Sequence, residues 1–405
     1  MQLDRPTEVM EVSVVIPCLN EADTLGRCIE KAARAMREHR IAGEIIVADN
    51  GSTDSSRLIA ARHGARVVTI DEPGYGNALM GGIAAARGRF VIMGDADDSY
   101  DFLELPKLVG KLREGFDLVQ GCRLPAGGGS VLPGAMPFLH RWFGNPFFSF
   151  LARRWFDAPI NDVYCGLRGF STAMYHRLGL RCTGMEFATE MIIKASLCGE
   201  HIAEVPITLH PDGRTSHAPH LKTFRDGWRT LRYFLICSPR WLFLVPSAFF
   251  VVAGLVGYLV AMPGLRIGHS TFDAHTLLFA SLALLCGYQC IVFAIFARTF
   301  ATVEGFLPPD SRLERFFEVM NLEKGLVAAA VAILVGGALL LAAVRQWWLV
   351  DFGRLDYAYT MRFVVPGATL VTLGVQTAFS SFFISIIGMR RTIRKSRAVS
   401  QPPVV

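Results

Sequence analysis

Four long apolar stretches fill the C-terminal part of the chain, and they constrain its fold more than any other feature. They cover about residues 241–262, 275–297, 325–344 and 363–387. The first contains no charged residue, and a helix needs about 20 apolar residues to cross a bilayer. The sequence therefore predicts four transmembrane helices over residues 240–389, followed by a basic tail at 390–405.

The charged residues between these stretches predict the orientation of the chain. An even number of spans puts both ends on the same side, and cytoplasmic segments carry an excess of Lys and Arg. The tail and the second connection are rich in both, whereas the first connection has only Arg266. The third connection, with Arg345, Arg354 and Arg362 beside two tryptophans, is ambiguous. We expect a multi-pass protein of the cytoplasmic (inner) membrane whose N-terminal region faces the cytosol.

The composition agrees with that location. The first residues, MQLDRPTEVMEV, lack the apolar core of a signal peptide. The nine cysteines are scattered without a CxxC pair, which suits a reducing compartment better than a disulfide or zinc framework. The net charge of +6 fits attraction to anionic headgroups. No nucleic-acid-binding motif accompanies this charge, so we expect no nucleic-acid partner.

Residues 1–218 have the pattern of an α/β domain. Apolar runs at 12–17, 44–48, 66–70, 89–93 and 117–121 predict strands, and helical stretches separate the first four. Such alternation predicts a mostly parallel sheet wrapped by helices. Ligands bind at the carboxyl ends of the strands in these sheets. Polar clusters follow the predicted strands at those ends.

Asp95-Ala96-Asp97 follows the fourth predicted strand and is the main candidate for a metal site. Hard divalent cations such as Mg²⁺ prefer carboxylate oxygens and can neutralise phosphate groups. Further oxygen atoms are available from Asp98, Ser99 and Asp101. The alternative interpretation is that these acidic residues cap the next helix.

The turns after the first two strands are candidates for nucleoside contacts. After the second strand, Asp49 and Asn50 can bond a base edge or a ribose, while Gly51 lets the backbone come close. The alternative is a turn in which Asp54 caps the next helix, and both can hold at once. The first strand ends in Pro17, Asn20 and Glu21, which can close around the nucleoside, although Asn20 is also an ordinary helix N-cap.

Three further residues are candidates for phosphate contacts. Gly76 opens a predicted helix whose free N–H groups can face a phosphate. Arg214 lies in the loop PDGRTS and can clamp a diphosphate as the site closes. Arg123 follows the fifth strand and can bind a lipid phosphate. The alternative for Arg214 is a snorkelling residue at the membrane surface.

Two segments interleave aromatic residues with arginines. They cover about residues 138–156 and 220–236, and Arg141 lies in the first. Helices of this kind often lie in the membrane interface, with rings among acyl chains and arginines near headgroups. We expect an interfacial helix at 138–156 and an amphipathic juxtamembrane helix at 219–239.

The motifs together resemble a known family. VSVVIPCLNEADTL, VADNGSTD, GDADD, DVYCGLRGF, GMEFATE and EVPITLHPDGRTS occur in the order and rough spacing of family 2 glycosyltransferases. More closely, they are similar to polyprenyl-phosphate sugar synthases of the dolichyl-phosphate mannose and glucose synthase type. The resemblance covers about residues 12–244. It implies a nucleotide-diphospho-sugar transferase (GT-A) fold and an inverting, metal-assisted transfer by a cytosolic catalytic domain at 1–218.

The resemblance also implies roles for individual residues. Asp95 and Asp97 match the metal-binding motif around Ala96, with Mg²⁺ or Mn²⁺ as cofactor, and Asp49 matches a nucleoside-contacting aspartate. Arg214 matches an arginine that contacts the diphosphate, and Arg123 one near the acceptor phosphate. Asp162 and Arg168 match a motif on the floor of the site, and Glu190, with Glu186 as the alternative, matches the helix glutamate that follows it. In departures from the family, Asn50 replaces an aspartate, Cys165 a serine and Ser99 a glutamine.

We expect the reaction to be transfer of a hexose to a polyprenyl phosphate. The resemblance favours UDP-glucose as donor, with GDP-mannose second. A lipid monophosphate is largely a dianion at neutral pH, since its second pKa is about 6, so it needs no strong general base. One alternative is a transferase to another lipid or to a polysaccharide, although no QxxRW signature is present. Another is a lipid-sugar flippase with a regulatory domain. A homo-oligomer remains open.

Overall fold

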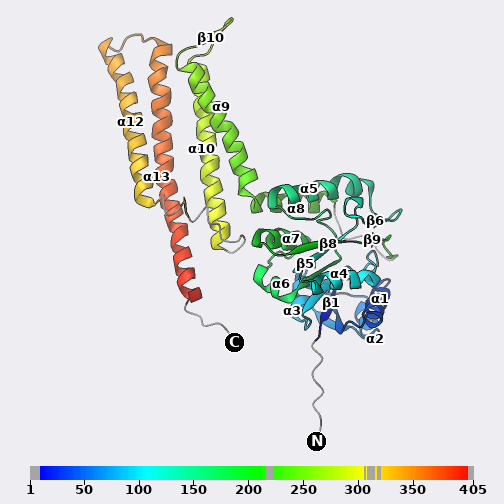
Figure 1. The fold of residues 1–405 in the computed structure, drawn as a ribbon. Helices are drawn as coiled ribbons and strands as arrows, with labels where there is room; N and C mark the ends of the chain where they lie inside the picture. Colours follow the sequence, from blue (N-terminus) through cyan, green and yellow to red (C-terminus); the bar gives the residue numbers. More distant parts are fainter. Residues whose placement is uncertain (1–9, 216–222, 305–306, 308–314, 317–320, 400–405) are drawn as a thin grey trace. The chain divides into compact units, whose positions relative to one another are not determined.

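The computed structural model describes residues 10–215, 223–304, 307, 315–316 and 321–399. Its internal contacts divide the chain into two units, Met1–Phe234 and Leu235–Val405 (Figure 1). The first unit is built around a sheet, and the second consists mainly of long helices. The predicted boundaries at 218 and 239 fall on either side of this division.

A seven-stranded sheet forms the centre of the first unit. Its order is β3-β2-β1-β4-β7-β5-β8. The strands are β1 (Val12–Cys18), β2 (Gly43–Asp49), β3 (Arg66–Thr69), β4 (Phe90–Met93), β5 (Leu118–Cys122), β7 (Arg168–Ser171) and β8 (Ile202–Pro206). All pairings are parallel except those of β7, which runs antiparallel between β4 and β5. The predicted α/β architecture with a mostly parallel sheet is confirmed.

Helices cover the sheet, and their apolar faces explain the arrangement. In α1 (Leu25–Glu38), Leu25, Cys28, Ile29 and Ala32 follow the helical repeat and are fully buried. The other helices of this layer are α2 (Ser56–Arg62), α3 (Tyr75–Ala84), α4 (Leu105–Arg113), α6 (Thr172–Leu178) and α7 (Glu186–Cys198). Short elements complete the unit: η1 (Phe102–Glu104), η2 (Pro125–Gly127), and the parallel pair β6 (Ser130–Val131) and β9 (Thr208–Leu209).

Two details differ from the sequence-based prediction. The first helix begins at Leu25 rather than at Asn20, because Asn20 has a left-handed backbone (φ +58°) and lies in a turn before the helix. The strands β8 and β7 were not predicted, and the residues of β7, RGFS, lack a long apolar run. Gly169 of this strand lies close to the side chains of Ile92 and Leu112, so an added Cβ atom there would require them to shift.

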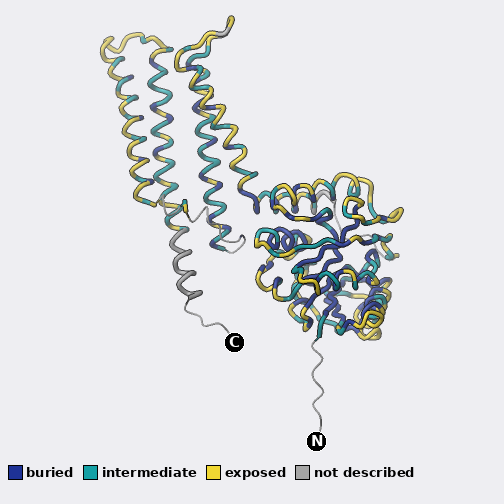
Figure 2. Tube along the Cα trace, viewed as in Figure 1, coloured by how far each residue is buried: buried dark blue, intermediate teal, exposed yellow. Residues whose placement is uncertain are grey.

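Two aromatic helices lie on the first unit. A π-helical turn, η3 (His140–Gly144), leads into α5 (Asn145–Phe156), and α8 (Thr223–Cys237) packs on α5 through Phe234. Phe234 is fully buried among Phe148, Trp155 and Phe156. The opposite face of η3 and α5 is exposed (Figure 2) and carries large apolar side chains. They are Trp142, Phe143, Phe147 and Phe150, with Phe138 and Leu139 just before them.

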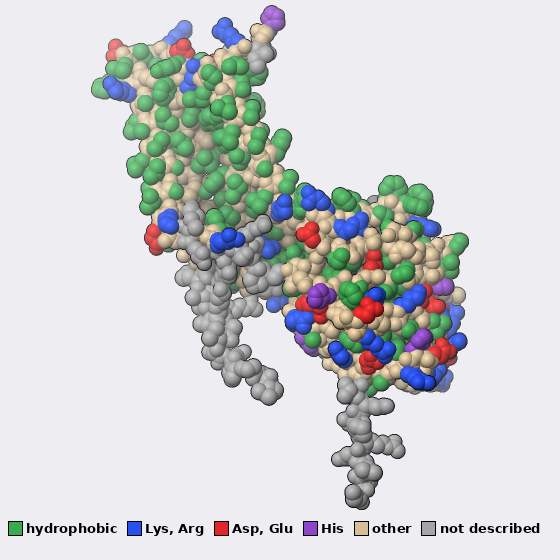
Figure 3. Space-filling model, viewed as in Figure 1, with side chains coloured by type: hydrophobic (Ala, Val, Ile, Leu, Met, Phe, Trp, Pro, Cys, Tyr) green, Lys and Arg blue, Asp and Glu red, His purple; other side chains and the backbone are tan. Residues whose placement is uncertain are grey.

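The second unit contains four helices that are long and apolar enough to span a membrane. The candidate spans are Arg240–Ala261, Ala274–Val303, Leu322–Leu349 and Tyr357–Ile387. They belong to η4 (Arg240–Leu244) with α9 (Val245–Ala261), α10 (Ala274–Val303), α12 (Leu322–Leu349) and α13 (Tyr357–Val399). Figure 3 shows hydrophobic side chains along this unit, with charged groups gathered towards its ends. The four predicted membrane helices are confirmed.

The four helices lie in a row, and polar side chains form hydrogen bonds between neighbours. α10 packs against both α9 and α13, and α12 packs against α13. Tyr258 of α9 bonds Ser281 of α10 at 2.6 Å, and Tyr288 of α10 bonds Thr377 of α13 at 2.6 Å. A short hairpin, β10 (Arg266–Ile267) with β11 (Ser270–Thr271), connects α9 and α10. The predicted tail begins inside α13, and its last residues, 400–405, lie outside the described residues.

Candidate active site

One edge of the sheet collects most of the predicted site residues. β2 ends at Asp49, β4 ends two residues before Asp95, and β5 ends directly before Arg123. β7 runs the other way and begins at Arg168, which pairs with Met93. Because these ends lie on the same side, residues far apart in the sequence meet there.

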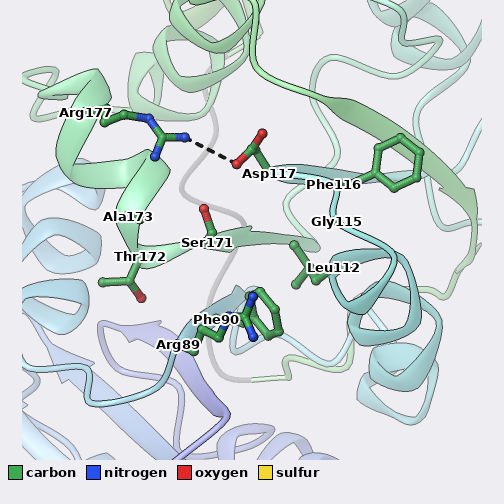
Figure 4. Close-up of a pocket in the computed structure, with 10 residues that line it drawn as sticks. All are labelled: Arg89, Phe90, Leu112, Gly115, Phe116, Asp117, Ser171, Thr172, Ala173 and Arg177. Atoms are coloured by element: carbon green, nitrogen blue, oxygen red, sulfur yellow. Dashed lines mark hydrogen bonds and ion pairs between the residues drawn. The ribbon is translucent and has the colours of Figure 1, made fainter.

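A surface hollow of about 430 Å³ lies at the opposite edge of the sheet (Figure 4). It is bordered by Phe90 at the start of β4, Asp117 before β5 and Ser171 at the end of β7. Arg177, on its rim, contacts Asp117 at 3.3 Å. None of the predicted site residues lines this hollow, so the candidate site is the carboxyl edge instead.

Asp95 is held by a phenol. Its Oδ1 accepts a hydrogen bond of 2.8 Å from the hydroxyl of Tyr75, at the start of α3. Burial and the charge of Asp97 raise the pKa of Asp95 to about 6, although the bond from Tyr75 opposes this rise. Burial also raises the pKa of Tyr75 well above its ordinary value, so the phenol is a neutral donor. A nearby positive charge would therefore stabilise the ionised form of Asp95.

Asp97 contacts Arg214 from the late loop. Its Oδ2 accepts from Nη2 of Arg214 at 3.1 Å, and its Oδ1 accepts from the amide and hydroxyl of Ser99 at 3.0 and 2.6 Å. Arg214 also contacts Glu21 at 3.0 Å and Asp212 at 2.6 Å. Burial opposes the charge of Arg214, but these three carboxylates raise its pKa above the ordinary value. The structure therefore brings together the two predicted partners of a diphosphate.

The loop that carries Arg214 is tied to the site through its backbone. The amide of Gly213 donates to the carbonyl of Asp97 at 3.0 Å, and Thr215 donates to Asp23 through its amide and its hydroxyl, both at 3.0 Å. The guanidinium of Arg27 reaches the carbonyl of Gly213 at 3.4 Å. Arg214 is thus held over the Asp95–Asp97 edge.

The chemistry of Asp95 and Asp97 fits a divalent cation. The two like charges interact, and a cation between them would relieve the repulsion that raises the pKa of Asp95. Within the described ranges, no group of three or more His, Cys, Asp or Glu side chains is arranged around a metal. In phosphate sites, Mg²⁺ commonly takes some of its ligands from the phosphate groups.

The neighbouring acidic residues have other partners. Asp98 is paired with Lys31 at 2.8 Å and with Arg27 at 3.3 Å. Asp101 caps η1 by accepting from the amide of Leu103. The carbonyl of Ala96 accepts from Thr24 at 2.6 Å. Asp98 and Asp101 are thus engaged by partners other than those of Asp95 and Asp97.

The turn after β2 is closed by its own polar groups. Asp49 is fully buried, and its carboxylate accepts from Nε of Arg57 at 2.6 Å and from the amide of Ser52 at 3.2 Å. Asn50 bonds three backbone groups between β3 and α3, including the amide of Gly74 at 2.7 Å. Gly51 has φ +93°, which glycine adopts without strain. The carboxylate of Asp49 is thus held by the backbone of its own turn and by Arg57.

The segment after β1 supports this turn from the side. Asn20 accepts from the amide of Thr53 at 2.8 Å and donates its own amide to Ser52 at 2.9 Å. Glu21 is buried and donates its amide to Ser56 at 2.9 Å, while its carboxylate contacts Arg214. Pro17 pairs with Ala48 inside the sheet. Asp54 accepts from the amide of Ser56 at 2.9 Å, but the N-cap of α2 is Ser55, so Asp54 is not the predicted cap of this helix.

Gly76 and Glu190 meet at a loop between α6 and α7. The amide of Gly76 donates to the carbonyl of Thr183 at 2.9 Å. Glu190 accepts from the amides of Arg181 at 2.9 Å and Cys182 at 2.7 Å, and it contacts Lys194 at 2.9 Å. The two predicted residues therefore hold one loop against the start of α3.

Arg123 and Asp162 form a buried pair. Nε and Nη2 of Arg123 donate to the two oxygens of Asp162 at 2.7 and 2.8 Å, and Nη1 reaches the hydroxyl of Tyr100 at 3.2 Å. Only 7% of Arg123 and none of Asp162 is exposed. Burial opposes the charge of Arg123, but Asp162 raises its pKa above the ordinary value. The predicted acceptor role of Arg123 is untested by this geometry, which shows a bidentate internal ion pair.

Arg168 and Arg141 occupy contrasting places. Arg168 is fully buried and donates to the carbonyls of Ala188 at 2.6 Å and Cys165 at 2.7 Å. Burial lowers its pKa, whereas Tyr75 and Asp95 oppose that change. Arg141 lies in η3, with its guanidinium 5.4 Å from the ring centre of Trp142. Arg168 thus lies beneath the Asp95 edge, and Arg141 belongs to the exposed aromatic surface.

The sequence-based reasoning missed two contacts at the centre of the site. Tyr75 directly precedes the predicted phosphate-facing residue Gly76, but its bond to Asp95 was not predicted. Arg57 lies in the first turn of α2, eight residues after Asp49. A conserved spacing would be needed to single out either one, and a lone phenol or arginine in a sequence carries no such signal.

Comparison with known proteins identifies the family. Residues 13–179 match the model described as glycosyl transferase family 2, and residues 295–388 match the family 2 C-terminal transmembrane region. The chain is 36% identical to the low-salt glycan biosynthesis hexosyltransferase Agl6 of Haloferax volcanii, over 93% of this chain and 89% of that protein. The chain is a family 2 glycosyltransferase. It is also a membrane protein, since both the family region and the four candidate spans point to one.

Other relatives of this glycosyltransferase match about half of its length. The dolichyl-phosphate hexose transferase of Haloferax volcanii is 31% identical, over 49% of this chain and 82% of that protein. The undecaprenyl-phosphate 4-deoxy-4-formamido-L-arabinose transferase of Salmonella choleraesuis is 29% identical, over 49% and 59%. Among solved structures, the glucosyl-3-phosphoglycerate synthase of Mycobacterium tuberculosis, in complex with Mn²⁺ and UDP, matches with 23% identity and a TM-score of 0.46, over 58% and 86%.

Proposed function

We propose that this glycosyltransferase moves a hexose from a nucleotide-diphosphate sugar to a polyprenyl phosphate, with inversion and with help from a divalent cation. One observation carries the proposal: Arg214, which lies far along the sequence from Asp95 and Asp97, meets this pair at the carboxyl edge of the sheet. Two relatives whose names include a dolichyl-phosphate or undecaprenyl-phosphate transferase activity support the choice of acceptor.

The arrangement of charges supports metal-assisted chemistry. A lipid monophosphate and a nucleotide diphosphate repel each other, so the main barrier is electrostatic. Asp95 and Asp97 would hold Mg²⁺ or Mn²⁺, which neutralises the charge of the leaving diphosphate. Arg214 exchanges its bond to Asp97 for a phosphate oxygen and thereby binds the same leaving group. Because the acceptor phosphate is already a dianion, no general base is required of the chain.

The nucleoside would lie against the turns after β1 and β2. Asn20, Asp49 and Asn50 fix these turns, and Gly51 leaves open space above its backbone. We favour UDP-glucose as donor, with GDP-mannose second. The hexosyltransferase activity in the name of the relative matched over most of this chain supports a hexose.

The acceptor would approach from the bilayer. The exposed rings of η3 and α5 suit insertion among acyl chains, with Arg141 near the headgroups. We propose that the catalytic unit faces the cytosol, where nucleotide sugars are made. The basic segment after the last span supports this orientation.

The test is donor-dependent labelling of lipid. Membranes that contain the full chain are given a panel of radiolabelled UDP- and GDP-sugars with polyprenyl phosphate, and the label in the organic phase is counted. We expect one donor to label the lipid, and EDTA to stop the reaction. A product whose stability in mild acid differs from that of a polyprenyl-phosphate sugar would point to another acceptor.

Asp97→Asn is the matched variant. It keeps the size of the side chain and an oxygen for the bond from Ser99, but removes the charge. We expect transfer to fall about 100-fold or more, because electrostatic stabilisation of the leaving group is lost, while the melting temperature changes little. Full activity of this variant would contradict the proposed role of a divalent cation.

A further inference from the structure

We propose that Tyr75 is a positioning residue that fixes the Asp95 carboxylate for a divalent cation. The inference rests on the proposed metal-assisted transfer and adds a residue that the motif around Asp95 does not contain. Its basis is the bond of 2.8 Å from the phenol to Oδ1 of Asp95. Both groups lie at the carboxyl edge of the sheet, Tyr75 at the start of α3 and Asp95 after β4.

The start of α3 is held tightly, so the phenol has a defined position. The amides of Gly76 and Asn77 donate to the carbonyl of Thr183 at 2.9 and 3.3 Å. A Cβ atom at Gly76 would lie 2.2 Å from the carbonyl oxygen of Cys182, and one at Gly74 would lie 2.5 Å from that of Thr183. The backbone approach on both sides of Tyr75 therefore requires glycine.

Two more contacts reinforce this clamp. Asn50 accepts from the amide of Gly74 at 2.7 Å, which ties the same turn to the end of β2. Glu190 fixes the facing loop by accepting from the amides of Arg181 and Cys182. Tyr75 is thus held between the nucleoside-side turn and the loop before α7. A side chain on such a rigid backbone can set the orientation of its partner.

The second oxygen of Asp95 is treated differently. A Cβ atom at Gly166 would lie 2.6 Å from Oδ2 of Asp95 and 3.0 Å from the ring of Tyr100. The amide of Gly166 is itself held by the hydroxyl of Tyr100 at 2.8 Å. Glycine at 166 therefore makes room for Oδ2, while Tyr75 holds Oδ1. The bond from Tyr75 therefore orients the carboxylate through Oδ1.

A fixed carboxylate is a better metal ligand than a mobile one. Carboxylates that bind metals are commonly oriented by hydrogen bonds from outer residues, and loss of such a partner typically weakens metal binding by about 10- to 100-fold. The phenol donates to one lone pair of Oδ1 and leaves the others free. Arg168, buried behind the pair, interacts electrostatically with both Tyr75 and Asp95.

Tyr75→Phe tests this role, because it removes only the hydroxyl. Mn²⁺ binding to the purified full chain is titrated by electron paramagnetic resonance, once with UDP and once with GDP present. We expect the Kd for Mn²⁺ to rise about 10-fold or more. In transfer assays, kcat at saturating Mn²⁺ should largely recover, so the defect appears in the metal concentration required. A general packing defect would lower kcat at every metal concentration.

Tyr175→Phe is the matched control. Tyr175 is also partly buried, and its ring stacks on Phe170 at 6.0 Å, but it lies in α6 away from the Asp95 edge. We expect its Mn²⁺ titration and its activity to match those of the parent chain. The melting temperatures of both variants are compared to exclude unfolding.

The outcomes separate this inference from the proposed function. If Asp97→Asn loses Mn²⁺ while Tyr75→Phe binds it within twofold of the parent chain, the role of Tyr75 is overturned and the metal site stands. If the parent chain itself binds no Mn²⁺ with either nucleotide, both the inference and the metal-assisted function are overturned.

Discussion

Arg123 and Asp162 show how a residue with a predicted catalytic role can be engaged within the protein itself. The two oxygens of Asp162 accept from Arg123, and both residues are almost completely buried. When one partner of such a pair is removed, the other is left as an unpaired buried charge, which costs about 3–5 kcal/mol. The geometry therefore makes the pair a determinant of stability before any role towards the acceptor.

Arg123→Met is expected to lower the free energy of unfolding by about 3–5 kcal/mol. The measurement is chemical unfolding of the purified chain in detergent, followed by the fluorescence of its tryptophans. Arg113→Met serves as control, because Arg113 pairs with Glu11 at the surface and its side chain is about half exposed. A variant that unfolds like the parent chain but has a raised KM for polyprenyl phosphate would instead favour the predicted contact with the acceptor.

At the residue scale, the sequence predicted which residues meet at the candidate site better than it predicted the contacts of each one. Asp95, Asp97 and Arg214 were expected near one another, and the structure places Arg214 3.1 Å from Asp97. The bond from Tyr75 and the pair of Arg57 with Asp49 could not be predicted, because each depends on how a helix start faces a strand end. Glu190 matched a family glutamate, but its contacts to a loop backbone follow only from the fold.

At the scale of elements, the exposed face of η3 and α5 is the feature with the clearest consequence. Phe143 of η3 is 61% exposed and Phe147 of α5 is 49% exposed, whereas the rings that contact Phe234 are those of Phe148, Trp155 and Phe156. Large apolar side chains on a helix that also carries arginines are typical of a segment in the membrane interface. The amphipathic pattern predicted this helix from sequence, although the π-helical turn at its start was not predicted.

Replacing Phe143 and Phe147 together by Ser should raise the KM for a long-chain polyprenyl phosphate by roughly 30-fold, since each ring loses apolar contact worth on the order of 1 kcal/mol. The KM for the nucleotide sugar should stay the same. The measurement is initial-rate kinetics in nanodiscs. Leu58→Ser is the control, because Leu58 is 53% exposed on α2, away from this surface. An equal change in both KM values would contradict an interfacial role.

Strand prediction succeeded where the apolar runs were long and failed where they were not. β1 is buried along its whole length, and its run VSVVIPC identifies it without a structure. β7 has only RGFS, and its position between β4 and β5 is set by pairing with both neighbours. An antiparallel strand inserted into a parallel sheet leaves no periodic signal of its own, so the topology on this side of the sheet had to come from the structure.

At the scale of the whole molecule, the chain joins a sheet-based unit to a unit of four candidate spans. The hydropathy of the second unit predicted the number of spans but not their order in space. In the structure, α10 and α13 are the inner helices, because α9 packs on α10 and α12 packs on α13. Arg362, in the ambiguous third connection, lies 3.6 Å from Asp273 before α10. That contact offsets one of the charges that made the orientation of this connection ambiguous.

Adjacent glycines of α12 allow a matched test of this order. A Cβ atom at Gly336 would lie 2.6 Å from the carbonyl oxygen of Gly367 and 2.8 Å from the amide nitrogen of Val371, both in α13, whereas one at Gly337 would meet nothing within 4 Å. Small residues at such contacts let helix backbones approach in membranes. Gly336→Val should therefore separate α12 from α13 and destabilise the unit by about 1–3 kcal/mol.

Gly337→Val carries the same change in helix propensity and should leave stability nearly unchanged, because its side chain would point into open space. Thermal unfolding of both variants in detergent gives the comparison, and the difference between them removes the intrinsic effect of valine. Since α12 contacts α13 through the face that carries Gly336, only that variant should lower the melting temperature. Equal losses in the two variants would mean that α12 and α13 do not pack through this face, and the row α9–α10–α13–α12 would have to be replaced by another arrangement.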